Sequence, residues 1–132
     1  MSESVGKVVW TDLTVPNAHE VREFYQAVVG YQFLPEPMGD YEDYHLIPPG
    51  APLEVGNSVL GICHAQGMNA QMPPAWLIYL SVADLAEALA RVVQHGGQIL
   101  YGPRMMGAEG FACIRDPAGA VCALYGPYTP PV

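Results

Sequence analysis

Trp10-Thr11-Asp12-Leu13-Thr14-Val15-Pro16-Asn17 has a counterpart 67 residues later in Leu77-Ile78-Tyr79-Leu80-Ser81-Val82-Ala83-Asp84. In each stretch, an apolar run rich in β-branched and aromatic residues ends at a residue that caps helices, which predicts a strand followed at once by a helix. The same offset relates other pairs along the chain: Glu20 and Glu87, Gly30 and Gly97, Tyr44 and Phe111. Internal repetition at a fixed offset predicts two copies of one supersecondary unit packed together, with a ligand pocket between them.

The first copy is expected to form a strand over residues 8–15 and then a helix. Asn17 and Glu20 have the spacing of a capping box, in which two side chains satisfy backbone N–H groups of the first turn. Gly30 is expected to end this helix in a left-handed conformation. The apolar residues at helical spacing predict its buried stripe: Val21, Phe24, Tyr25 and Val28.

The second copy repeats this order of strand, capping box and helix, and its helix contains residues of higher helix propensity. A strand is expected over residues 76–82, followed by a capping box of Asp84 and Glu87. Gly96 and Gly97 should end the helix. Its buried stripe is predicted from the same spacing: Leu85, Ala88, Leu89 and Val92.

Three short strands are expected after each helix, so each copy is βαβββ and the fold class is α+β. In the first copy the strands are predicted at 31–34, 44–47 and 58–64, and in the second at 98–101, 111–115 and 120–125. The run 102–110 is expected to be flexible, and residues 105–110 have the composition of a mobile lid or a plain connecting loop. The whole chain, 1–132, is expected to be a single domain, with module one over about 5–65, a linker over 66–74, module two over about 75–127 and a tail over 128–132.

Composition excludes several classes of function. A chain of 132 residues that is 51% hydrophobic can build a packed core, and a net charge of -8 argues against binding to nucleic acid or an anionic membrane. No run approaches the roughly 20 apolar residues of a membrane span, and the first residues lack a signal-peptide pattern, so a cytoplasmic protein is expected. The three cysteines have no metal-ligand spacing.

An unbulged turn over 116–119 would set Cys113 opposite Cys122, and two reduced thiols are expected there.

Several motifs in order resemble the vicinal oxygen chelate superfamily, the group of glyoxalases, bleomycin-resistance proteins and extradiol dioxygenases. The resemblance covers about residues 5–127 and is closest to a branch related to lactoylglutathione lyase. It implies two βαβββ modules packed as an open eight-stranded barrel with a central cavity. The matching motifs are Trp10-Thr11-Asp12-Leu13-Thr14-Val15, Phe24-Tyr25, Val29-Gly30-Tyr31, Trp76-Leu77-Ile78-Tyr79, Gly96-Gly97 and Asp116-Pro117-Ala118-Gly119-Ala120-Val121-Cys122-Ala123-Leu124-Tyr125.

The resemblance also implies where a divalent metal would be bound. In metal-containing members, His, Gln or Glu stands near the start of each module's first strand and on its last strand. These positions fall on Trp10, Leu77, Ala123 and near Gly61, none of which supplies a ligand atom. We therefore expect no metal cofactor, with an irregular site that uses His64 as the alternative.

Alternation along the strands converts the alignment into a map of the pocket, because residues i and i+2 share a face. Leu13, Val15 and their counterparts should pack under the helices. The residues expected to face the pocket are Trp10, Asp12, Thr14, Leu77, Tyr79, Ser81, Val121, Ala123 and Tyr125, with Ala112, Ile114 and His45 added by strand pairing.

Two of these residues are candidates for catalysis. Asp12 could be a general base or a ligand's hydrogen-bond acceptor, or it could hold a neighbouring group of the fold. His45 could pair with Asp12, which would orient its imidazole, or it could be a satisfied core histidine. Arg104 could meet an anionic ligand at the mouth, or simply be solvated. The ligand-binding residues predicted are Trp10, Thr14, Leu77, Tyr79, Ala123, Tyr125 and Arg104.

These features favour a protein that binds a small apolar or aromatic molecule, as the resemblance to bleomycin-resistance proteins implies. The alternative is a lyase, isomerase or oxygenase that uses Asp12 and His45 for proton transfer or an irregular metal site. A third reading is an interaction module whose cavity is filled by its own aromatic residues. A small-molecule ligand and a homodimer are the partners expected.

Overall fold

The computed structural model describes residues 5–131 of the chain. It divides into two compact units, one formed by residues 11–76 and the other by the residues up to Trp10 together with those from Leu77 on. We refer to these as the N-terminal unit and the C-terminal unit. Strand β1 (Val8–Val15) begins in the C-terminal unit and ends in the N-terminal unit.

In the N-terminal unit the elements after β1 are helix α1 (Ala18–Val29) and strands β2 (Gln32–Pro37), β3 (Glu42–Ile47) and β4 (Leu60–His64). The strands lie in the order β2-β3-β4-β1, with β1 parallel to β4 and the other pairs antiparallel. Two single-turn 3-10 helices, η2 (Val55–Asn57) and η3 (Gly67–Asn69), lie in the connections on either side of β4.

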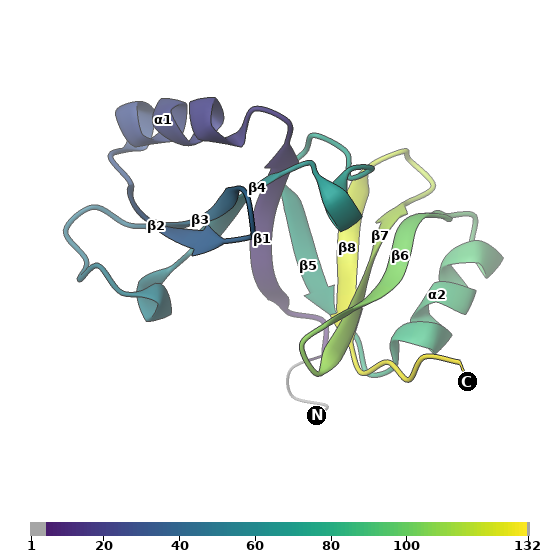
Figure 1. Ribbon diagram of the computed structural model, residues 1–132. Coiled ribbons are helices and arrows are strands. Elements are labelled where there is room, and N and C mark those ends of the chain that lie inside the picture. The colour runs from purple at the N-terminus through teal and green to yellow at the C-terminus, as the bar shows by residue number, and fades with distance from the viewer. Residues whose placement is uncertain (1–4, 132) are drawn as a thin grey trace. The chain divides into compact units, whose positions relative to one another are not determined.

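The C-terminal unit repeats this order of elements (Figure 1). Its elements are strand β5 (Leu77–Ser81), helix α2 (Leu85–Gln94) and strands β6 (Gln98–Met106), β7 (Glu109–Arg115) and β8 (Val121–Gly126). The strands lie in the order β5-β8-β7-β6, with β5 parallel to β8. The prediction of an α+β fold made of two βαβββ modules is confirmed.

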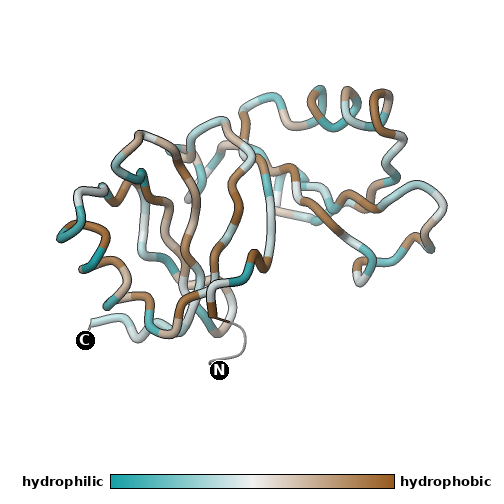
Figure 2. The backbone as a smooth tube through the Cα atoms, turned by 180° about the vertical axis from the view of Figure 1, so that it is seen from behind, coloured by the Kyte–Doolittle hydropathy of each residue, from teal (hydrophilic) through white to brown (hydrophobic). Residues whose placement is uncertain are grey.

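Helix α2 forms as its sequence predicts. The Asp84 carboxylate accepts a hydrogen bond of 3.0 Å from the backbone N–H of Glu87, so the N-terminus is capped. Leu85 and Leu89 are buried in the core of this unit. Hydrophobic and hydrophilic segments alternate along the helix, as the buried stripe requires (Figure 2). The core beneath α2 contains Leu85, Leu89, Ala112, Ile114 and Leu124.

Helix α1 departs from its prediction at two points. The Asn17 side chain makes no bond to the helix backbone, and its amide donates instead to the Glu20 carboxylate over 3.3 Å, so the capping box does not form. The predicted stripe is also wrong in part, because Phe24 and Val28 are 57% and 63% exposed. The buried face of the helix is centred on Ala18 and Arg22 instead.

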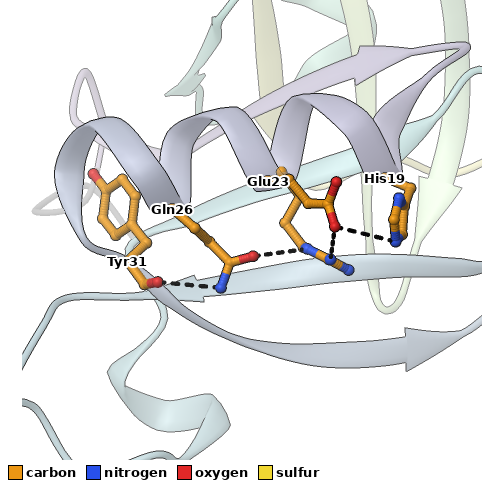
Figure 3. Close-up of polar contacts among 5 residues, drawn as sticks. His19, Glu23, Gln26 and Tyr31 are labelled. Carbon is orange, nitrogen blue, oxygen red and sulfur yellow. Dashed lines mark hydrogen bonds and ion pairs between the residues drawn. The ribbon is translucent and has the colours of Figure 1, made fainter.

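Arg22 explains the rotated face of α1. Its guanidinium carbon lies 4.0 Å from the ring centroid of Phe33 and 4.7 Å from that of Tyr44, so the cation is stacked on two aromatic rings in the core. Its Nε donates to the Gln26 side chain over 3.0 Å, and Gln26 donates to the Tyr31 carbonyl over 3.4 Å. These contacts form a polar chain along the helix (Figure 3). Counting apolar residues at helical spacing cannot predict this buried face, because the count leaves out an arginine that buries its aliphatic stem.

Trp76 packs on the same helix. Its indole N–H donates to the Tyr25 hydroxyl over 3.1 Å, and the two rings meet edge to face with centroids 5.3 Å apart. Trp76 is the last residue of the N-terminal unit, and this contact packs it against the core of that unit.

The predicted register of the β7–β8 hairpin is wrong by one residue. Arg115 pairs with Val121, so the connecting loop has five residues rather than four. The Asp116 carboxylate holds this longer loop by accepting bonds from the backbone N–H groups of Ala118 and Ala120. Cys113 consequently lies opposite Ala123 and Cys122 opposite Ile114, which puts the two cysteines on opposite faces of the sheet, and they form no disulfide with each other.

The run 102–110 is part of a hairpin rather than a loop or lid. Strand β6 continues to Met106, and Arg104 pairs with Phe111 before the turn at 107–108. A shift in register between Tyr101 and Arg104 accommodates the break that the Gly and Pro of this run introduce. The tail is not wholly detached, since Tyr128 packs against the core beneath α2. Within residues 5–131, no helix is both long and apolar enough to span a membrane.

Candidate functional site

In the N-terminal unit, one face of the sheet carries α1 and the other does not. Leu13, Val15 and Tyr44 pack in the core beneath the helix, so the alternate residues point away from it. We call this second surface the helix-distal face. In its central row, Asp12 lies beside Gly61 and Gly61 beside His45.

His45 is bound to a neighbour other than the one expected. Its Nε2 lies 2.8 Å from the carboxylate of Glu36 on β2, and its side chain is 22% exposed. Asp12 lies two strands away in the row, which separates the Cα atoms of Asp12 and His45 by about 10 Å. Glu36 therefore orients the imidazole, and the predicted Asp12–His45 pair is not formed.

The next row of the same face holds a partly buried thiol and a second carboxylate. Cys63 pairs with Thr14, and its thiol is hydrogen-bonded to Asp43. The Asp43 carboxylate also accepts a 2.7 Å bond from the backbone N–H of His64. Burial raises the pKa of Asp43, and burial together with the nearby charges of Asp12 and Asp43 raises the pKa of the Cys63 thiol far above neutrality. Cys63 is therefore a protonated hydrogen-bond donor and not a nucleophile.

The helix-distal face of the C-terminal unit is aromatic at the same positions. One row runs from Tyr79 through Ala123 and Cys113 to Tyr101, and the next runs from Ser81 through Tyr125 and Phe111 to Arg104. The Phe111 ring contacts those of Tyr79 and Tyr101, with centroids 6.1 Å and 6.0 Å away.

A cavity of about 180 Å³ opens on this aromatic face. Three of the predicted ligand-binding residues, Trp10, Tyr79 and Tyr125, come together in its wall. Leu77 and Ala123 are fully buried in the same unit, and Arg104 lies on β6 two residues before Met106. The cavity is lined by Val9, Trp10, Tyr79, Met106 and Tyr125.

The structure corrects two residues of the pocket map and adds two others. Ala112 and Ile114 lie beneath α2 rather than in the pocket, because the hairpin register is shifted by one residue. Phe111 and Cys113 take their place on the helix-distal face. The two helix-distal rows show that His45 corresponds to Cys113, an offset of 68 residues, whereas the sequence repeat gave 67. The pocket map has the correct face for His45 because the error in the hairpin register and the error in the repeat offset cancel. The signal that could have found the shift is the acceptor side chain of Asp116 at the start of the turn.

The residues present do not fit the metal site that the resemblance implies. Trp10, Leu77, Ala123 and Gly61 offer no imidazole, carboxylate or thiolate. Across residues 5–131, no group of three or more His, Cys, Asp or Glu side chains is arranged to hold a metal ion. The irregular site that uses His64 stays a prediction: the Nδ1 of His64 lies 2.7 Å from the backbone carbonyl of Glu42 and 3.7 Å from Asp43, and its Nε2 is the ring nitrogen that a metal would use.

The chain is similar to curated and solved proteins over most of its length. It is 27% identical over 92% of its residues to proteins of Mycobacterium tuberculosis (strain CDC 1551 / Oshkosh) and Mycobacterium bovis that carry the name "Putative glyoxylase CFP32". It spans 44% of the length of these relatives.

Among solved structures, methylmalonyl-CoA epimerase from Mycobacterium tuberculosis is 17% identical with a TM-score of 0.54, over 98% of this chain and 93% of that one. A methylmalonyl-CoA epimerase in complex with methylmalonyl-CoA and NH4+ is 16% identical with a TM-score of 0.55, over 94% and 96%. A hypothetical protein from Bacillus halodurans C-125 is 15% identical with a TM-score of 0.56, over 96% and 98%. At such identities the likeness shows the fold alone.

The model of one protein family covers nearly the whole of the repeat. It matches residues 7–124, from just before β1 into β8. The chain belongs to the Glyoxalase/Bleomycin resistance protein/Dioxygenase superfamily.

Proposed function

We propose that this protein binds a small organic molecule with one aromatic or apolar ring in the cavity on the helix-distal face of the C-terminal unit. The observation that carries the proposal is the lining of that cavity, in which three aromatic side chains and a methionine surround a volume of about 180 Å³. A dry apolar cavity of roughly 150 Å³ is enough to hold benzene. The volume therefore favours a single ring over a larger ligand.

The lining residues suit different parts of such a ligand. Trp10, Tyr79 and Tyr125 offer flat faces for stacking, and the tyrosines add hydroxyl groups that can fix its orientation. Met106 can adapt to the ligand's outline, because its unbranched side chain has several rotatable bonds. Leu77 and Ala123 give the surrounding core its apolar character.

The relatives suggest other ligands, but the residues of this chain argue for the smaller one. One structural neighbour binds methylmalonyl-CoA, and the curated relatives are named as glyoxylases. Apolar residues occupy the metal-ligand positions of this chain, which leaves a metal-assisted reaction without its ligands. Sequestration of an apolar molecule requires no metal ligands.

An NMR titration tests the proposal. Toluene and phenol should shift the indole resonance of Trp10 saturably and leave that of Trp76 in place, since Trp76 lies in the core beneath α1. Tyr125→Ala should weaken binding at least tenfold by removing one wall. Tyr41→Ala, a change in the N-terminal unit, is the matched control and should bind like the wild type. If neither compound moves the Trp10 resonance, the proposal fails.

A second candidate function rests on the polar face of the N-terminal unit. Asp12 and Asp43 are both more than nine-tenths buried, and His45 is oriented by Glu36. Buried carboxylates and an oriented imidazole are the groups that general acid–base catalysis uses. In this reading Asp12 is the base and His45 the acid of a lyase or isomerase.

Screening for turnover separates the two candidates. For any substrate found, Asp12→Asn should abolish turnover and leave the melting temperature within about two degrees of the wild type. A large loss of stability in this variant would make Asp12 a structural residue and remove the enzymatic candidate. The expected homodimer also stays a prediction, which light scattering on purified protein would test.

A further inference from the structure

The aromatic face of the C-terminal unit contains a buried hydroxyl group without a hydrogen-bond partner. Tyr101 is 8% exposed, and its hydroxyl oxygen has no partner within the described part of the chain. Leaving such a group unpaired in a protein interior destabilises the fold, and most buried polar groups are paired for that reason. A bound ligand is one source of the missing partner.

Arg104 is the second unusual group on this face. Its guanidinium carbon lies 5.6 Å from the centroid of the Tyr101 ring. Three of the other cations have side-chain partners: Arg22 and Arg91 approach glutamates, and Arg115 donates to Gln98. Among residues 5–131, no carboxylate lies within ion-pair distance of Arg104. Lys7 and Arg115 also have no carboxylate partner among these residues, so what distinguishes Arg104 is its exposed position on the aromatic face, near the Tyr101 ring.

Strand geometry places Arg104 next to the cavity, and Tyr101 lies in the adjacent row of the same face. Arg104 and Met106 are two residues apart on β6, so they share a face about 7 Å apart, and Met106 lines the cavity. The row from Arg104 through Phe111 ends beside the cavity at Tyr125, about 10 Å away between Cα atoms. An arginine side chain spans much of that distance.

We propose that the ligand is a small aromatic carboxylate whose ring stacks on Trp10, Tyr79 and Tyr125 and whose carboxylate is bound by Arg104 and Tyr101. This inference rests on the proposed function and adds the charge of the ligand to it. The guanidinium supplies charge-assisted hydrogen bonds, and the Tyr101 hydroxyl supplies one neutral donor. Phe111, which contacts both Tyr79 and Tyr101, provides the apolar surface between the ring and the carboxylate.

Phenylacetate and phenylacetamide form the matched pair of probes, because they have the same shape and differ in charge. Titrations followed by NMR should show phenylacetate binding about tenfold or more tighter than phenylacetamide. Arg104→Gln should abolish that preference by weakening phenylacetate binding alone. Arg91→Gln removes the same charge from the exposed side of α2 and should leave the preference intact.

Tyr101→Phe tests the hydroxyl through two readouts, melting temperature and affinity, that separate a ligand-binding role from a structural one. Without ligand, the variant should melt at the same or a higher temperature, since it removes an unpaired buried group. It should also bind phenylacetate several-fold more weakly. A lower melting temperature with unchanged affinity would mean that the hydroxyl serves the fold, and would overturn its assignment.

The outcomes separate this inference from the proposed function. Equal affinity for the two probes, with no effect of Arg104→Gln, overturns the inference and leaves a binding site for neutral rings. Failure of both probes and of toluene to shift the Trp10 resonance overturns both proposals.

Discussion

The helix-distal faces of the two units have the same backbone pattern and opposite chemistry. In the N-terminal unit the central row reads Asp12, Gly61, His45 and Leu34, and in the C-terminal unit the corresponding row reads Tyr79, Ala123, Cys113 and Tyr101. Beneath the helices both cores are built mainly of apolar residues, and the N-terminal one also contains Arg22. The repeat therefore preserves the residues that hold each helix on its sheet, while the opposite faces differ, one ionisable and the other aromatic.

This difference suggests a division of roles. The aromatic face contains the apolar cavity, and the polar face holds buried acids, a thiol and a paired histidine. The family's metal-ligand positions on the last strands fall near Gly61 in one face and on Ala123 in the other. Substitutions in matched pairs, one from each unit, can break or sharpen this comparison.

The largest effect is expected from removing the central ring of the aromatic face. Phe111→Ala deletes a 7%-exposed ring that contacts Tyr79 and Tyr101, and it should cost about 3 to 5 kcal/mol of unfolding free energy. His45→Ala, on the polar face, should cost less than about 1 kcal/mol, since its side chain is partly exposed and its ion pair reaches solvent. Urea denaturation measures both. Equal losses would contradict the division of roles.

The next largest effect compares arginines on the two helices. Arg22→Met removes a cation stacked on Phe33 and Tyr44 and should cost about 2 kcal/mol, even though methionine refills part of the space. Arg91→Met removes an exposed i,i+4 pair with Glu87 and should cost under about 0.5 kcal/mol. Thermal denaturation of the two variants makes the comparison, and a smaller loss for Arg22 than for Arg91 would refute it.

A smaller difference is expected between the two helix caps. Asp84→Ala removes the bond to the Glu87 N–H and should cost about 1 kcal/mol. Asn17→Ala should cost no more than a few tenths, since the Asn17 side chain makes no cap bond. Chemical denaturation of the pair, at pH 7 and moderate salt, distinguishes the caps. A loss at Asn17 as large as that at Asp84 would show that the amide caps α1 in solution.

The smallest effect is a change in pH dependence. Burial raises the pKa of Asp43 in the folded protein, so its contribution to stability is full below its unfolded pKa of about 4 and is lost as pH rises through the folded value. Asp43→Asn cannot ionise and lacks this loss. The melting temperature of the variant minus that of the wild type should therefore increase as pH rises from 4 upward. A difference that is flat or falls with pH would mean that the carboxylate is not held against ionisation.

Much of the fold could be predicted because its signals are local. Strand β1 has the predicted bounds, α2 begins at its capping box, and a left-handed Gly30 ends α1. The strand alternation that puts Leu13 under a helix and Asp12 on the other face also holds. Each of these features depends on residues within one turn of helix or one strand.

The errors arose where a side chain overrides a local pattern. The Asp116 carboxylate stabilises a five-residue turn, which shifts the register of β7 and exchanges Ala112 for Phe111 on the helix-distal face. Arg22 rotates α1 by burying its stem, against the count of apolar residues. Tyr101 carries no signal in sequence, because an unpaired hydroxyl is a property of its surroundings.

The hydrogen bond from Cys63 to Asp43 has a practical consequence for handling the protein. Electrophiles and peroxides react with thiolates, and the raised pKa of Cys63 leaves almost none at neutral pH. Cys113 is fully buried, and burial also raises the pKa of Cys122. Maleimide dyes should therefore react slowly with Cys63 and Cys113, and Cys122, which is partly exposed, is the native cysteine to replace before a probe is attached to a cysteine on an exposed loop.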